Sequence, residues 1–146
     1  MTNQRNDLFY VCSMIEYTAR KTNNHRGAII EKMKETGIEK ELYDAEVNHC
    51  PSYEQVCDEW IDKYQIPMGN FDTISDCPYS IPSATAIGKL YADLIELCAK
   101  KGEEIQELIK IFSSFVSDAI SDFRAGYYYM NPDYLRCSYQ EGYLLD

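Results

Sequence analysis

Residues 103–123 read EEIQELIKIFSSFVSDAISDF, and this stretch decides the fold class. Its large apolar side chains recur at intervals of three and four residues, which is the spacing of one face of a helix. They are Ile105, Leu108, Ile109, Phe112, Phe115, Val116, Ala119, Ile120 and Phe123. Glu103 and Glu104 suit the positive end of a helix dipole, and Gly126 is a suitable terminator. We therefore predict one long amphipathic helix over residues 103–125.

A second helical pattern precedes it, from Pro82 or Ser83 to about Lys101. Its apolar stripe consists of Ile87, Leu90, Tyr91, Leu94, Leu97 and Cys98. Pro82 is expected at the first helical position, where the N–H that proline lacks would have no partner. Lys100 and Lys101 complement the negative end of the helix, and Gly102 closes it. The two helices are expected to form an antiparallel hairpin because the turn between them is so short.

Shorter helices are expected in the first half of the chain. Their predicted ranges are 7–20, 25–36, 38–47 and 52–64, and a last short helix is predicted over 132–140. Asp7 is the expected N-cap of the first, and Gly37 is the expected terminator of the second. Ser52 and Gln55 have the spacing of a capping box. No segment shows the alternation that is typical of a β-strand.

These patterns predict an all-α bundle of five to seven helices. We expect a small helical lobe over residues 1–66, an ordered loop over 67–82, and a helical hairpin with a tyrosine-rich tail over 83–146, together forming one compact body. The predicted core consists of Val11, Ile15, Ile29, Leu42, Trp60, Leu90, Leu94, Leu108, Phe112, Phe115 and Phe123. The apolar loop residues Met68, Phe71, Ile74 and Tyr79 are expected to hold the loop against the helices.

The charge of the chain excludes some classes of partner. The 146 residues include 24 acidic and 14 basic side chains, a net charge of −10. Binding to duplex nucleic acid needs a basic face, so we expect none. No apolar run reaches the length of a membrane span, about 20 residues. The first seven residues are polar and contain no apolar signal core, so we expect a cytoplasmic protein.

Six cysteines are present, and we expect them to be free thiols because a cytoplasmic protein lies in a reducing compartment. His49, Cys50, Cys57 and Cys77 form the one cluster of residues that resembles a metal site. Its spacing lacks the close ligand pairs of structural zinc sites. We therefore expect no metal and no cofactor, with a small all-α enzyme or metal-binding protein using these four residues as the alternative.

Two features favour a surface that binds another protein. Six of the 13 tyrosines lie in the last 20 residues, and the side chains of three consecutive tyrosines cannot all face one core. Residues 39–63 contain eight acidic and two basic side chains. The expected partner-binding residues are Tyr127, Tyr128, Tyr129, Glu46, Asp58 and Glu59. A homodimer is a second arrangement that would cover the exposed rings.

Residues 9–64 contain four short motifs that carry a resemblance. These are FYVCSMIEY at 9–17, a helix ending in Gly37, LYDAEVNH at 42–49 and SYEQV at 52–56. The segment resembles a family of short, uncharacterised helical proteins of gut Firmicutes, which are often encoded beside toxins of the ADP-ribosyltransferase type. The resemblance implies an antitoxin or toxin-partner role and supplies no catalytic residues. Because the sequence assembles no catalytic constellation, we favour a protein-interaction module over an enzyme.

Overall fold

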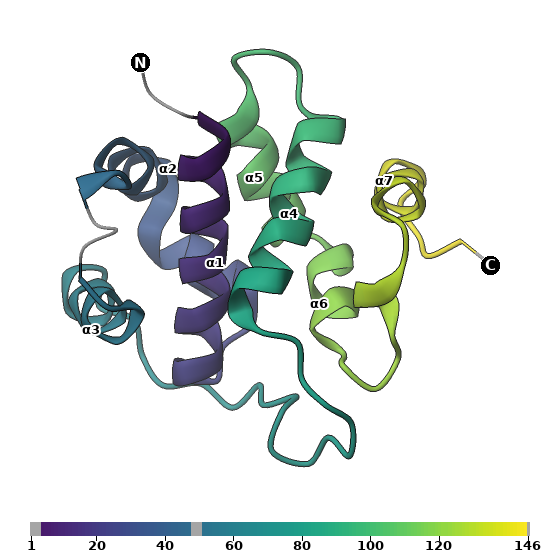
Figure 1. The fold of residues 1–146 in the computed structure, drawn as a ribbon, viewed down its shortest axis with the longest axis horizontal. Helices are drawn as coiled ribbons and strands as arrows, with labels where there is room; N and C mark the ends of the chain where they lie inside the picture. Colours follow the sequence, from purple (N-terminus) through teal and green to yellow (C-terminus); the bar gives the residue numbers. More distant parts are fainter. Residues whose placement is uncertain (1–3, 48–50, 146) are drawn as a thin grey trace.

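A computed structural model describes residues 4–47 and 51–145 of the chain. Its described part is built from seven α-helices and one 3₁₀ turn, without a β-strand, so the all-α prediction is confirmed (Figure 1). The elements are α1 (Gln4–Thr22), α2 (Arg26–Asp44), α3 (Tyr53–Lys63), α4 (Ala84–Cys98), α5 (Glu104–Phe112), α6 (Phe115–Ser121), η2 (Tyr127–Tyr129) and α7 (Pro132–Glu141). None of the described helices is both long enough and apolar enough to cross a membrane.

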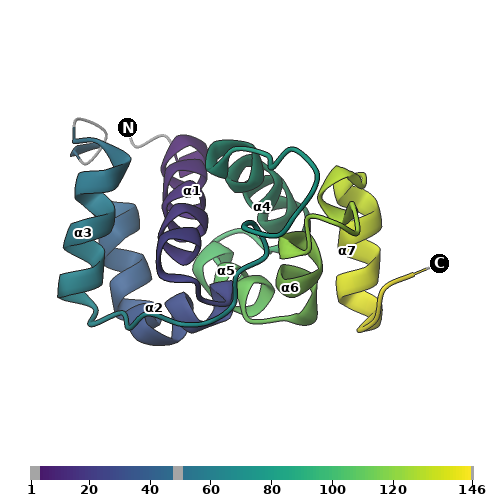
Figure 2. The same cartoon turned by 90° about the horizontal axis from the view of Figure 1, so that it is seen from below.

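α1 is the central helix of the bundle. Residues 10–16 on it are buried without interruption, as expected for a helix enclosed by others. It packs most extensively against α4 and also contacts α2 and α3, while α3 and α7 lie at opposite ends of the molecule (Figure 2). One core therefore includes residues from both sides of the 67–82 loop. The predicted core residues that are buried are Val11, Ile15, Ile29, Trp60, Leu90, Leu94, Leu108, Phe112 and Phe123.

The prediction of one long helix in the phenylalanine-rich stretch is wrong, because α5 and α6 are separated at residues 113–114. The Ser114 hydroxyl donates to the carbonyl of Ile111 at 2.7 Å and accepts from the N–H of Val116 at 3.3 Å. Serine hydroxyls compete in this way with the hydrogen bonds of a helical backbone. The interruption changes the direction of the following side chains, and Phe115, predicted to lie in the core, is 37% exposed.

The sequence predicts a break between two helices at Gly37, and the structure has this break three residues earlier. α2 is kinked at Lys34, whose φ of 63° and ψ of 174° are not helical, and its second segment continues past Gly37 to Asp44. Gly37 is buried, and a Cβ on it would lie 2.9 Å from Cε1 of Tyr64. The glycine therefore permits close approach of the Tyr64 ring to α2 and does not terminate the helix. Leu42, predicted to lie in the core, is half-buried.

The capping box that the sequence predicts at the start of α3 is confirmed. The Ser52 hydroxyl accepts from the N–H of Gln55 at 3.2 Å, and the Gln55 side chain accepts from the N–H of Ser52 at 3.1 Å. Two other helix starts differ from prediction. Ser83 caps α4, so Pro82 precedes the cap, and Asp7 lies in the first turn of α1 and is not its N-cap.

The loop over residues 67–82 is held by about half of the side chains expected to hold it. The Phe71 ring stacks on His25 with 3.7 Å between the ring centroids, and Ile74 packs against the core. Met68 and Tyr79, in contrast, are 67% and 61% exposed. These two side chains therefore contribute little to fixing the loop.

Candidate functional site

The residues predicted to bind a partner do not form one surface. Asp58 and Glu59 are exposed on α3, and the tyrosines of η2 lie beside α7, on the opposite side of the molecule (Figure 1). Glu46 is exposed just after α2, at a third location. We therefore compare the exposed apolar surface and the charge at each location, because a single partner of ordinary size would contact one of them.

The three consecutive tyrosines are divided between the protein and the solvent. Tyr129 is 81% exposed, whereas Tyr127 and Tyr128 are half-buried. The Tyr128 ring makes an edge contact with Phe123, with 5.6 Å between centroids. The tail itself is anchored by the fully buried Leu135 on α7. The prediction that the three rings cannot share one core is confirmed, and one exposed ring is a small surface for binding.

The structure describes two of the four residues of the predicted metal cluster, and they lie on different elements. Cys57 is buried on α3 and Cys77 is half-buried in the loop, while His49 and Cys50 lie outside the described residues. Within residues 4–47 and 51–145, no three histidine, cysteine or acidic side chains are grouped to hold a metal ion. Burial raises the pKa of the Cys57 thiol, which disfavours the nucleophilic thiolate. The four-residue cluster stays a prediction.

A groove with a volume of about 720 Å³ opens where several helix ends meet. Leu8 of α1, Leu42 of α2 and Ile105 of α5 supply apolar surface to it. Tyr43 and Val47 also line it, although they are 87% and 74% exposed. The first turn of α1 lies between the end of α2 and the turn that joins α4 to α5 (Figure 1). The groove therefore combines apolar lining with two large apolar side chains that the described part of the chain leaves mostly exposed.

Five carboxylates line the same groove, and its lining contains no lysine or arginine within the part of the chain that the structure describes. They belong to Asp7, Asp44, Glu46, Glu96 and Glu104. Asp44 accepts a hydrogen bond from the Lys40 ammonium at 2.8 Å. Glu96 pairs with the Arg5 guanidinium at 2.7 Å. These two carboxylates are therefore partly neutralised from outside the groove.

The carboxylates of Glu46 and Glu104 keep the groove negative. Glu46 and Glu104 form no ion pair with any other described residue. α2 and α4 both end at this site, and neither has a basic side chain in its last turn. The negative ends of these two helices add to the carboxylate charges, whereas α1 and α5 begin at the groove and their positive ends offset part of this negative charge. Lys100 and Lys101 follow α4 in the turn but do not line the groove.

Sequence reasoning found Glu46 but missed the groove around it. Leu42 and Ile105 were expected to pack inward because each lies on a helical apolar stripe. Both are half-buried, and their remaining exposed surface lines the groove. The available signal was the segment LYDAEV at 42–47, which mixes large apolar and acidic residues at the end of a helix.

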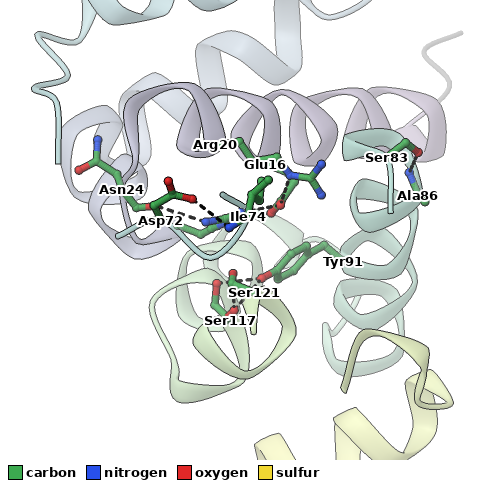
Figure 3. Close-up of polar contacts among 11 residues, drawn as sticks. Glu16, Arg20, Asn24, Asp72, Ile74, Ser83, Ala86, Tyr91, Ser117 and Ser121 are labelled. Carbon is green, nitrogen blue, oxygen red and sulfur yellow. Dashed lines mark hydrogen bonds and ion pairs between the residues drawn. The ribbon is translucent and has the colours of Figure 1, made fainter. Parts of the chain in front are cut away.

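A second polar cluster is buried beneath the loop (Figure 3). Glu16 is fully buried, and its two oxygens accept from Nε and Nη2 of Arg26 at 2.8 and 2.6 Å. Arg20 donates from Nε to the same carboxylate at 2.8 Å. Nearby, the hydroxyls of Tyr91 and Ser117 lie 2.8 Å apart. Because Glu16 is paired on both oxygens, we assign the cluster to holding α1 and α2 together.

The acid stability of the protein is expected to depend on Glu16. Burial is the largest single influence on this carboxyl and favours its protonated form, but the hydrogen bonds and charges of Arg26 and Arg20 together hold its pKa below the usual value of 4.5. A lowered pKa in the folded state stabilises the fold fully above the unfolded-state pKa, and this stabilisation is lost as the pH falls through the folded-state pKa.

Urea unfolding of the wild type and Glu16→Gln, at neutral pH and near pH 3.5, measures this dependence. The wild type is expected to lose more free energy of unfolding over this interval than the variant, which has no carboxyl to protonate at that position. Equal losses in the two proteins would contradict the assignment of a lowered pKa to Glu16.

Comparison of the chain with protein-family models, with curated proteins and with solved structures finds no match. The geometry and charge of the groove are therefore the basis for a functional assignment.

Proposed function

We propose that this chain is a protein-interaction module that holds a segment of another protein in the groove at the ends of α1, α2 and α4. The observation that carries the proposal is that the side chains of Tyr43 and Val47 are exposed to solvent at a groove with apolar lining. An exposed apolar patch with a polar rim is typical of a binding site. Neither side chain stabilises the fold by burial. A bound partner would bury both, and this would explain why large apolar side chains occupy exposed positions.

We further propose a regulatory role in the cytoplasm, in the manner of an antitoxin that neutralises its toxin. The motifs in residues 9–64 support this, because the proteins they resemble are often encoded beside toxins of the ADP-ribosyltransferase type. The five described cysteines are free thiols, which suits a reducing compartment. Glu46 is the residue of the predicted binding set that the groove uses.

Site-specific photo-crosslinking tests the proposal. A photoreactive benzoylphenylalanine replaces Tyr43, whose 87% exposure makes the change harmless to the fold. The same replacement at Tyr79, which is 61% exposed on the 67–82 loop, is the matched control. After irradiation in cells of the source organism, we expect a discrete adduct at position 43. Its yield should be at least about tenfold above that at position 79, because an interface covers a small part of the surface and only residues within it lie close enough to the partner to crosslink.

The adduct is identified by mass spectrometry, and an excess of unmodified protein is expected to suppress it. Equal yields at the two positions, or no adduct at Tyr43, would count against a partner in the groove.

A further inference from the structure

The distribution of charge around the groove limits what it can hold. Asp44 and Glu46 lie on the side of α2, and Glu96 and Glu104 lie on the side of the turn between α4 and α5. The N-terminal part of α1 lies between these sides (Figure 1), and its Leu8 lines the groove. An occupant must therefore bury an apolar face centrally and place positive charge on both flanks. A neutral or acidic segment would leave the carboxylates of Glu46 and Glu104 without a counter-charge.

A second copy of this chain fits the groove poorly. The chain has a net charge of −10, and like charges brought together at an interface cost several kcal/mol. An extended strand also fits poorly, because the described part of the molecule contains no sheet edge to which it could bond. A helix satisfies its own backbone hydrogen bonds and binds through its apolar side chains. An apolar groove between helix ends can therefore accept the apolar face of a helix.

We propose that the occupant is a basic amphipathic helix of the partner protein; this inference rests on the proposed function. Apolar side chains spaced i, i+3 or i+4, and i+7 on that helix contact Leu8, Leu42 and Ile105. Lysine or arginine side chains on either flank of its apolar face pair with Glu46 and Glu104.

Three synthetic peptides test this with the full-length protein. The first is a lysine-rich amphipathic helix with leucine at i, i+3, i+4 and i+7. The second has the same leucines with glutamate in place of lysine, and the third has the composition of the first in scrambled order. We expect the first to bind at least about tenfold more tightly than the others, because only it has both the apolar face and the charge. NMR shift changes are expected at Leu42, Val47 and Ile105.

A charge-reversal pair locates the binding. Glu46→Lys with Glu104→Lys is expected to weaken binding of the first peptide at least about tenfold. The control, Asp58→Lys with Glu59→Lys, makes the same change in net charge on the exposed face of α3. It is expected to weaken binding less than about threefold, since charges beyond a Debye length are screened. Equal effects of the two pairs would overturn the placement of the helix in the groove.

The two proposals fail in different ways. If the Tyr43 adduct forms but the acidic or scrambled peptide binds as well as the basic amphipathic one, the groove holds a partner of other chemistry and this inference is wrong. Self-association that Glu46→Lys with Glu104→Lys abolishes would assign the groove to a second copy and would also overturn it. If no adduct forms and no peptide shifts the groove resonances, both proposals are wrong.

Discussion

Replacing Arg26 with methionine is expected to lower the free energy of unfolding by about 3–5 kcal/mol, the usual cost of removing one partner from a buried ion pair. The Arg26 side chain is 2% exposed, and the Glu16 carboxylate that it binds is fully buried. In the variant, Arg20 alone would face that charge, and its own side chain is 16% exposed. Urea denaturation at neutral pH, followed by circular dichroism, measures the loss.

Two further variants separate the buried charge from simple loss of an arginine. Arg124→Met removes an exposed arginine that donates to the carbonyl of Asp76, and it is expected to cost about 0.5 kcal/mol or less. Combining Glu16→Met with Arg26→Met is expected to restore part of the lost stability, because no unpaired carboxylate is then buried. An Arg26→Met loss no larger than that of Arg124→Met would refute the argument.

The parts of the fold that the sequence predicted well are those fixed by local interactions. The capping box at Ser52 and Gln55 needs only residues within one turn, and it forms as predicted. The helical spacing of apolar residues correctly identified most of the core, because an amphipathic helix packs its apolar stripe against the rest of the protein. The interruption before Phe115 was missed because the Ser114 hydroxyl hydrogen-bonds to the backbone, and the spacing of apolar residues does not reveal such a bond.

The groove could not be predicted for a different reason. Leu8, Leu42 and Ile105 are far apart in the sequence, and only the tertiary packing of α1, α2 and α5 brings them together. Periodicity shows which face of a helix is apolar, but it does not show whether the same chain covers that face. The acidic character of residues 39–63 pointed to Glu46 and also to Asp58 and Glu59, because charge density alone does not distinguish a groove from a solvated helix face.

The position of α1, and with it one wall of the groove, depends on how closely α4 approaches. Gly88 of α4 is buried against Ser13 of α1, and a Cβ on it would lie 2.1 Å from the Ser13 hydroxyl oxygen and 2.7 Å from the Ser13 Cα and N atoms. Real Cβ atoms do not approach backbone so closely, so α4 and α1 must separate to accept even one methyl group. Glycine is therefore required here by contact between helices and not by backbone conformation.

Gly88→Ala is accordingly expected to lower the free energy of unfolding by about 3 kcal/mol, at the upper end of the usual cost of overpacking. The change gains up to about 1 kcal/mol of helix propensity, which is too little to offset the clash. Ser13→Ala is not expected to rescue the variant, because the backbone atoms of residue 13 remain in place. Thr85→Ala, at an exposed position one turn earlier on α4, is the control and should melt within a few degrees of the wild type. Thermal melts of the wild type, Gly88→Ala, Gly88→Ala with Ser13→Ala, and Thr85→Ala test this expectation. If Gly88→Ala were as stable as the control, α4 could separate from α1 without cost, and close packing of these two helices would not fix the groove.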